Sequence, residues 1–304
     1  MRRLWVAAQV ALIGLVAYFV GRSITRNWAE VRGSGATIHL DLGALAAAIA
    51  IILASYALLI GAWRAVLLGW GERLRYPAAA RIWCLSNLAR YVPGRIWQIA
   101  GMAALAQQAG VRPWAAAGSA IIVQLLAVAT GALVTGLLVP QSGHPLLIVA
   151  AGLAAAVGVG TLAWEPSTKL FARMLSALGR PFQLAPVAAG PLVVSAAVTT
   201  FAWVAYGLAL HFCARGLLGR AAIPVGTAIG VFTGSYLFGL IAVFTPGGLG
   251  VREGALYLWL SGPLGPAGAT VVSIGSRILM TGTEILAALI ALSLTRRTGD
   301  GPEA

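Results

Sequence analysis

The chain has 304 residues, of which 60% are hydrophobic and only 10% are charged. Its apolar runs are too long for the core of a soluble protein, so the composition predicts an all-α, polytopic membrane protein. The formal net charge of +13 does not indicate a nucleic-acid-binding protein, because no soluble segment is present on which a basic patch could form. We expect these charges mainly in cytoplasmic loops and near anionic lipid headgroups.

We expect about six full spans and two interrupted segments within one transmembrane domain that covers residues 1–304. The first span is expected to stay attached, because no small-residue cleavage site follows its apolar run. The predicted spans are residues 4–20, 42–63, 114–139, 145–164, 187–212 and 267–294. The interrupted segments are residues 81–108 and 224–262, and the second contains a short helix at 253–260 that is too brief to cross.

The first interrupted segment is either a kinked span or a re-entrant hairpin. Each half is roughly 20 Å long, whereas the hydrocarbon core is roughly 30 Å thick. The positive-inside rule favours the hairpin, because a full span would place Lys169, Arg173 and Arg180 outside. Both termini are then cytoplasmic, and the two interrupted segments enter from opposite sides. Opposed interruptions of this kind are typical of inverted-repeat transporters.

The first interruption lies at Pro93-Gly94, with Arg90 before it and Arg95 after it. Proline removes a backbone donor and glycine loosens the chain, so a helix is expected to stop there. Charge at bilayer depth is costly, and the two arginines must therefore face a wet cavity, a carboxylate or an anionic ligand. Polar side chains that add hydrogen-bonding capacity beside this interruption are Asn87, Tyr91 and Gln98.

The second interruption precedes a predicted helix start and is rich in glycine. Its loop residues are Pro246, Gly247, Gly248 and Gly250. Such a loop leaves backbone N–H groups free to surround an anion at the positive end of the helix, and a lipid phosphate fits this description. The alternative is a simple kink that allows close helix packing. Arg252 and Glu253, together with the other arginine-bearing interruption, favour the anion site.

Two carboxylates are available as counter-charges at this depth. Glu253 can pair with its neighbour Arg252 or with an arginine across the cavity, and Glu284 lies seven residues after Arg277 on the same helix. The arginines that Glu253 could balance across the cavity are Arg90, Arg95 and Arg277. A buried ion network that holds the bundle together is an equal alternative, and it is compatible with a ligand-binding role.

No pattern in the chain indicates catalysis. The histidines are scattered near helix ends, and no Ser-His-Asp set, carboxylate pair, metal-ligand cluster or P-loop is present. We therefore expect no catalytic residue, no metal and no cofactor. The expected partners are the membrane and a phospholipid or glycolipid, with no nucleic acid, and the oligomeric state is left open.

Residues 87–97 and 245–254 resemble the two signature segments of the lysylphosphatidylglycerol synthase transmembrane, or flippase-like, family. Arg277 falls where that family usually has an arginine in its last helix. In full-length members this membrane part moves an aminoacylated phospholipid between leaflets, while a separate soluble domain synthesises the lipid. Because the present chain ends at Ala304, ten residues after the last predicted helix, the resemblance implies a flippase-like part without the synthase domain. The identity of the lipid stays open.

These observations predict a flippase-like protein of the bacterial inner membrane that binds or moves a lipid headgroup. The arginines expected to hold the phosphate are Arg90, Arg95 and Arg252. One alternative is a scaffold for a lipid-modifying enzyme or a glycosyltransferase. A prenyl diphosphate phosphatase is a weaker alternative, because that chemistry needs clustered carboxylates and a nucleophile, and the glycine loop offers only Glu253.

Overall fold

The computed structural model describes residues 39–91, 96–138, 187–219, 223–241 and 246–297, together with positions 150, 152, 153, 157 and 160. Within this part the chain is helical and contains no β-strand, which confirms the predicted all-α class. The predicted span at 4–20 lies outside the described residues, and so does most of the span at 145–164. The helices are α2 (Leu42–Gly69), α3 (Tyr76–Leu88), η1 (Ala89–Tyr91), α4 (Ile96–Gln108), α5 (Pro113–Leu138), α8 (Ala189–Leu218), α9 (Val225–Ile241), η2 (Pro246–Gly248) and α10 (Val251–Arg297).

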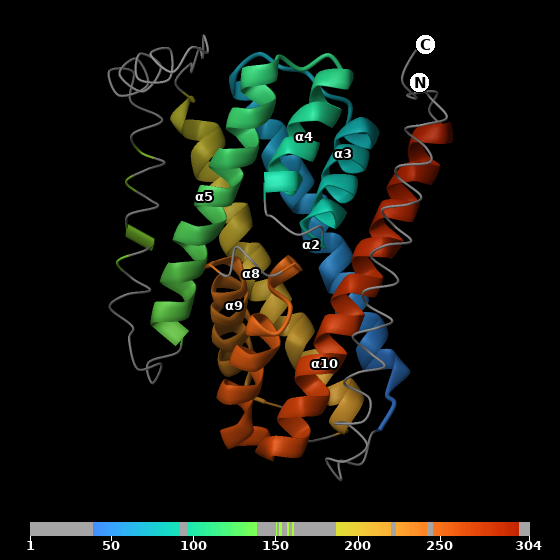
Figure 1. Cartoon of the computed structure of the whole chain (residues 1–304), viewed down its shortest axis with the longest axis vertical. Helices are drawn as coiled ribbons and strands as arrows, with labels where there is room; N and C mark the ends of the chain where they lie inside the picture. Colours follow the sequence, from blue (N-terminus) through green and yellow to red (C-terminus); the bar gives the residue numbers. More distant parts are fainter. Residues whose placement is uncertain are drawn as a thin grey trace.

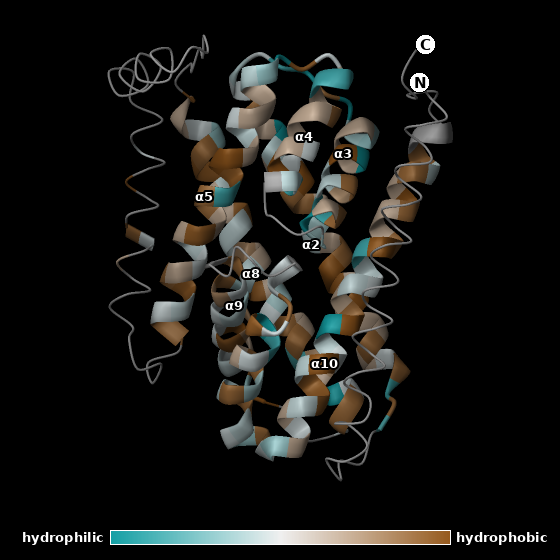
Figure 2. Cartoon of the chain, viewed as in Figure 1, coloured by the Kyte–Doolittle hydropathy of each residue, from teal (hydrophilic) through white to brown (hydrophobic). Residues whose placement is uncertain are grey.

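Four of these helices, α2, α5, α8 and α10, are long and apolar enough to cross a membrane. They form the long axis of the bundle in Figure 1. Figure 2 shows apolar residues along most of their length, with hydrophilic residues gathered near the upper ends of α3 and α4 and at isolated places within the bundle. The structure is therefore that of a multi-pass membrane protein.

The long helices are joined by hydrogen bonds as well as by apolar packing. The Trp63 indole N–H on α2 donates to Ser119 Oγ on α5 at 3.0 Å. The Trp203 indole N–H on α8 donates to Thr130 Oγ1 on α5 at 3.1 Å. A buried indole N–H needs such a partner, and in an apolar bundle these bonds fix how the helices face one another.

The first interrupted segment is a hairpin. Helices α3 and α4 pack against each other and both lie in the upper half of the bundle, with η1 at the tip (Figure 1). Each helix has 13 residues, or roughly 20 Å, and neither alone reaches across a core of roughly 30 Å. The chain thus returns toward the end from which it entered, as a re-entrant segment does and a kinked span does not.

The second interrupted segment is a hairpin of opposite orientation. Helix α9 and the first limb of α10 lie in the lower half of the bundle, and η2 joins their inner ends (Figure 1). The first limb ends at Gly265, whose φ of 70° is not helical and which lies between Pro263 and Pro266. The second limb then runs along the bundle as a long span. Segments η1 and η2 are in contact, so the tips of the two hairpins meet in the interior.

Several predicted boundaries were wrong by a few residues. Helix α3 begins at Tyr76 rather than at residue 81, because Pro77 suits the first turn of a helix. Helix α2 continues past Trp63 to Gly69, and α8 continues past residue 212 to Leu218. Each extension adds an arginine to the helix, Arg64 in α2 and Arg215 in α8. A long arginine side chain can reach from a helix end to a polar partner, so the helix accommodates its charge.

Candidate functional site

A cavity of about 100 Å³ lies where the first hairpin meets the long helices. One water molecule needs roughly 10–15 Å³, so this space holds several. Residues from α2, α3, η1, α4, α5, α8, α9 and α10 line it. Its polar groups include the side chains of Asn87, Arg90, Gln98, Gln124 and Glu284. The cavity therefore has room for water and a charged lining although it lies within an apolar bundle.

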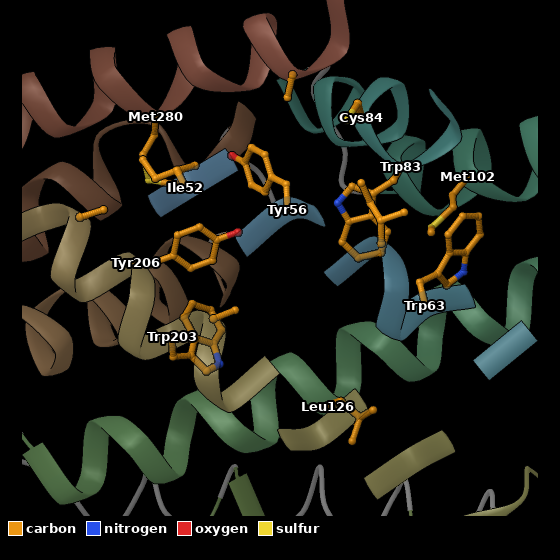
Figure 3. Close-up of a cluster of buried hydrophobic side chains, with 14 of the residues drawn as sticks. Ile52, Tyr56, Trp63, Trp83, Cys84, Met102, Leu126, Trp203, Tyr206 and Met280 are labelled. Atoms are coloured by element: carbon orange, nitrogen blue, oxygen red, sulfur yellow. The ribbon is translucent and has the colours of Figure 1, made fainter. Parts of the chain in front are cut away.

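Aromatic rings form much of the remaining wall. Tyr56 and Tyr206 meet edge to face with ring centroids 6.2 Å apart, and Trp203 and Tyr236 do so at 5.2 Å. Figure 3 shows the side chains of this region converging from several helices. Those that line the cavity in this view are Tyr56, Trp83, Met102, Trp203, Tyr206 and Met280. The wall thus combines apolar ring surface with phenol and indole groups that can form hydrogen bonds.

Arg90 forms an ion pair with Glu284 of α10, and only 4% of Glu284 is exposed. The Tyr56 hydroxyl donates to Glu284 Oε1 at 3.3 Å, and the Tyr91 hydroxyl lies 3.0 Å from Oε2. The same Tyr91 hydroxyl is 2.9 Å from Thr281 Oγ1. One carboxylate therefore connects α2, η1 and α10.

The local sequence explains how Arg90 reaches the cavity. Residue 92 precedes a proline and so disfavours the α-helical conformation, and the chain tightens into the short 3-10 segment η1 after α3. Beyond the interruption, Gln98 Nε2 donates to Asn87 Oδ1 at 2.7 Å, which links α4 to α3. This bond holds the hairpin closed beside the cavity.

A second polar cluster surrounds the glycine loop. Arg277 Nη1 donates to the Gly247 carbonyl oxygen at 3.0 Å and lies 3.3 Å from Glu253 Oε1. The backbone N–H of Gly250 donates to Glu253 Oε2 at 2.7 Å. Glu253 thus lies in the first turn of α10. A carboxylate at this position caps free backbone N–H groups and is stabilised by the positive end of the helix dipole.

Arg252 is 4% exposed and does not line the cavity. Its Nη2 donates to Met280 Sδ at 2.9 Å, and its guanidinium carbon lies 4.8 Å from the Phe232 ring centroid and 5.7 Å from that of Tyr236. Since Tyr236 and Met280 both line the cavity, they separate Arg252 from Arg90. The expectation that these two arginines share one pocket is therefore wrong for this structure.

Within the described residues the ion pairs decide between several of the alternatives that the sequence left open. Glu253 pairs with Arg277 rather than with Arg252 beside it. Glu284 pairs with Arg90 and not with Arg277 on its own helix. The predicted residues thus fall into two adjacent groups, one around the cavity and one around the glycine loop.

The remaining predicted residues have the following positions. Pro93, Gly94 and Arg95 lie outside the described residues. Pro246 and Gly248 belong to η2, and Gly248 packs closely against Gly239 of α9. Sequence reasoning missed the wall residues Tyr56, Tyr206 and Tyr236, and it assigned Gln124 to hydrogen bonding between helices rather than to the cavity. The only signal for them was a polar atom inside an otherwise apolar span.

Two loop glycines provide a matched test of this packing. Gly248 has a φ of 72°, and a Cβ there would lie 2.9 Å from Gly239 Cα on α9; Gly250 has a φ of 84° and nothing within 4 Å. A left-handed conformation costs an alanine roughly 1–2 kcal/mol, and overpacking adds roughly 1–3 kcal/mol. We expect Gly248→Ala to lower the unfolding midpoint in detergent clearly more than Gly250→Ala. Equal effects would contradict the close approach of η2 to α9.

Comparison with protein families identifies a model that covers nearly the whole chain. The model of the lysylphosphatidylglycerol synthase TM region matches residues 6–288, which is nearly the whole chain. The matched range contains both interruptions and the two ion pairs at their tips. Comparisons with curated proteins and with solved structures give no significant match.

Proposed function

Because the chain belongs to the lysylphosphatidylglycerol synthase transmembrane family, we propose that it binds a phospholipid or glycolipid headgroup and moves it between the leaflets of the bacterial inner membrane. The observation that carries this proposal is the polar cavity at the tip of the first hairpin, with Arg90 in its wall. A charged group inside an apolar bundle costs free energy, and such groups usually mark a functional site. Binding of an amphipathic lipid headgroup is a function that accounts for this one.

Arg90 is the group proposed to hold the phosphate. Its side chain is 15% exposed, and its Nη1 has only a long contact of 3.4 Å with the Tyr236 hydroxyl. A phosphate oxygen forms a shorter, charge-assisted hydrogen bond to such a donor. Polar groups that can contact the rest of the headgroup are Asn87, Gln98, Gln124 and the Tyr206 hydroxyl. The acyl chains stay in the bilayer.

The opposed hairpins supply the proposed movement. Their tips, η1 and η2, touch in the interior, and the Arg90–Glu284 pair ties the first hairpin to α10. An incoming phosphate competes with the Glu284 carboxylate for the Arg90 guanidinium, so binding loosens this tie. Rearrangement of one hairpin against the other then exposes the headgroup to the opposite leaflet, as in other transporters with interrupted helices.

We propose no chemical step for this chain. The two carboxylates near the interruptions, Glu253 and Glu284, each pair with an arginine, and this occupies the groups that a phosphatase would use. Release of phosphate from a prenyl diphosphate by the purified protein would instead support the enzyme.

The proposal is tested by a leaflet-exposure assay in proteoliposomes with a panel of phospholipids and glycolipids. Wild type is expected to move at least one lipid faster than protein-free vesicles. Arg90→Gln is expected to slow that movement about tenfold or more, because a hydrogen bond to a charged group contributes roughly 1.5–3 kcal/mol. Arg215→Gln, an exposed arginine on α8, is the matched control and should retain the rate.

Two results would contradict the proposal. The first is no movement of any lipid above the protein-free rate. The second is equal movement by wild type and Arg90→Gln. If lipid movement is absent while the chain still assembles with a lipid-modifying enzyme or a glycosyltransferase, the scaffold alternative is favoured.

The orientation in the membrane gives a separate prediction. Basic residues gather at the end of the bundle that carries the α2–α3 and α4–α5 connections, which is the upper end in Figure 1. The positive-inside rule therefore places this end in the cytoplasm. In intact cells Arg215→Cys should react with an impermeant thiol reagent, whereas Arg112→Cys should react only after permeabilisation. The native Cys84 and Cys213 are buried and leave a low background. Labelling of Arg112→Cys from outside would reverse the orientation.

A further inference from the structure

We propose that Arg252 is a second phosphate-binding residue, located behind the cavity and reached when the side chains of Tyr236 and Met280 move aside. The proposal rests on the function proposed above, because it adds a second station for the same headgroup. Arg90 lies at the tip of one hairpin, and Arg252 lies at the tip of the opposed one. A phosphate that passes from the first to the second would change hairpins midway through the bundle.

The charges near the glycine loop do not balance within the described part of the chain. All four carboxylates described there already have other roles: Asp41 caps α2, Glu72 pairs with Arg112, Glu253 pairs with Arg277 and Glu284 pairs with Arg90. Arg252 therefore has no carboxylate partner among the described residues. A buried cation without a counter-charge is costly, and an anionic ligand would remove that cost.

Donors around Arg252 are also left without acceptors. Nε of Arg252 has no hydrogen-bond partner in the described structure, and neither do Nε and Nη2 of Arg277. Both side chains are more than nine-tenths buried. Arg277 Nη2 lies 3.1 Å from the position that a Cβ would take at Gly247, so the absence of a side chain there lets the loop backbone approach these donors closely. The positive end of α10 adds to the attraction for an anion.

The partition between the two arginines is thin and consists of two side chains. The Tyr236 hydroxyl accepts from Arg90 Nη1 at 3.4 Å, and the Tyr236 ring also lies against Arg252. Met280 lines the cavity and accepts from Arg252 Nη2 through its sulfur. A thioether is a weak acceptor on a flexible chain, so a phosphate replaces it readily. In the proposed transfer these two side chains move aside and so connect the stations.

The test uses the unfolding midpoint of the full chain in detergent, because a ligand that binds the folded state raises it. The probes are inorganic phosphate and phosphatidylglycerol, with chloride at matched ionic strength as the reference. We expect both Arg90→Gln and wild type to respond to phosphate, and the double variant Arg90→Gln/Arg252→Gln to lose the response. Arg252→Gln alone should weaken the apparent affinity about tenfold or more. Arg215→Gln should respond as wild type does.

The ligand-free midpoint separates binding from packing. Because Arg252→Gln removes an unpaired buried cation, we expect its midpoint without phosphate to equal or exceed that of wild type. Arg252→Lys keeps the charge and should retain part of the phosphate response. A response to inorganic phosphate means that the phosphate group alone is recognised. A response to phosphatidylglycerol, without one to inorganic phosphate, means that the lipid headgroup is required. Either response supports the site if it depends on Arg252.

The inference is overturned if Arg252→Gln keeps the full phosphate response, or if it lowers the ligand-free midpoint and leaves the response intact. These results differ from failure of the proposed function. A wild-type protein that binds phosphate through Arg252 but moves no lipid overturns the transport proposal alone. A protein that moves lipid, while Arg252→Gln changes neither its rate nor its phosphate response, overturns the second site alone.

Discussion

Glu284→Gln is expected to destabilise the protein by about 3–5 kcal/mol, because it leaves the Arg90 guanidinium buried without its counter-charge. The glutamine keeps the shape of the side chain, removes the charge and replaces one acceptor oxygen with an NH2 donor. In the native protein the carboxylate also contacts the hydroxyls of Tyr56 and Tyr91. The substitution therefore weakens contacts among α2, η1 and α10 together. The measurement is the free energy of unfolding in mixed micelles.

Glu72→Gln is the matched control. Glu72 also pairs with one arginine, Arg112, but 54% of that arginine side chain is exposed, and such a pair is worth roughly 0–1 kcal/mol. The double variant Arg90→Met/Glu284→Leu should recover most of the stability, because replacing both members of a buried pair by apolar residues is often neutral. Equal losses in Glu284→Gln and Glu72→Gln would show that the buried pair does not hold the hairpin in place.

The interruptions of the helices were predictable because their causes are local. Pro246 and its neighbouring glycines cannot continue a helix, and the structure has η2 at this position. The same holds for Pro263 and Pro266, between which the helical conformation breaks at Gly265. The hairpin form of the first segment followed from its length and from the distribution of basic residues. The breaks themselves need no knowledge of distant parts of the chain, whereas the hairpin form also depended on the downstream basic residues Lys169, Arg173 and Arg180.

The ion pairing could not be predicted, because it depends on how the hairpins are placed relative to the long helices. Glu284 lies seven residues from Arg277 but pairs with Arg90, which is 194 positions away in the sequence. The separation of Arg252 from the cavity likewise depends on the side chains of Tyr236 and Met280. No spacing rule contains this information.

The aromatic wall of the cavity was missed for a related reason. Helices α2, α5 and α8 are apolar on all sides, because one side faces lipid and the other faces protein. Their periodicity therefore does not show which face turns inward. Tyr56, Tyr206 and Gln124 became recognisable as wall residues only when the structure placed them around one cavity.

Ala127→Phe is expected to stop lipid movement, because Ala127 of α5 lines the cavity and a phenyl ring would occupy it. An engineered cavity of roughly 150 Å³ takes up a benzene ring, so a ring leaves little room for a headgroup in about 100 Å³. The same substitution at Ala117 is the matched control. Ala117 is also half-buried on α5, but it does not line the cavity.

Both variants are first checked for folding by their unfolding midpoints, since overpacking costs roughly 1–3 kcal/mol. The direct test of the account is then the rate of lipid exchange between leaflets in proteoliposomes that contain wild type, Ala127→Phe or Ala117→Phe. We expect Ala127→Phe to fall to the rate of protein-free vesicles while Ala117→Phe keeps the wild-type rate. If a folded Ala127→Phe moves lipid as fast as wild type, the headgroup does not pass through this cavity.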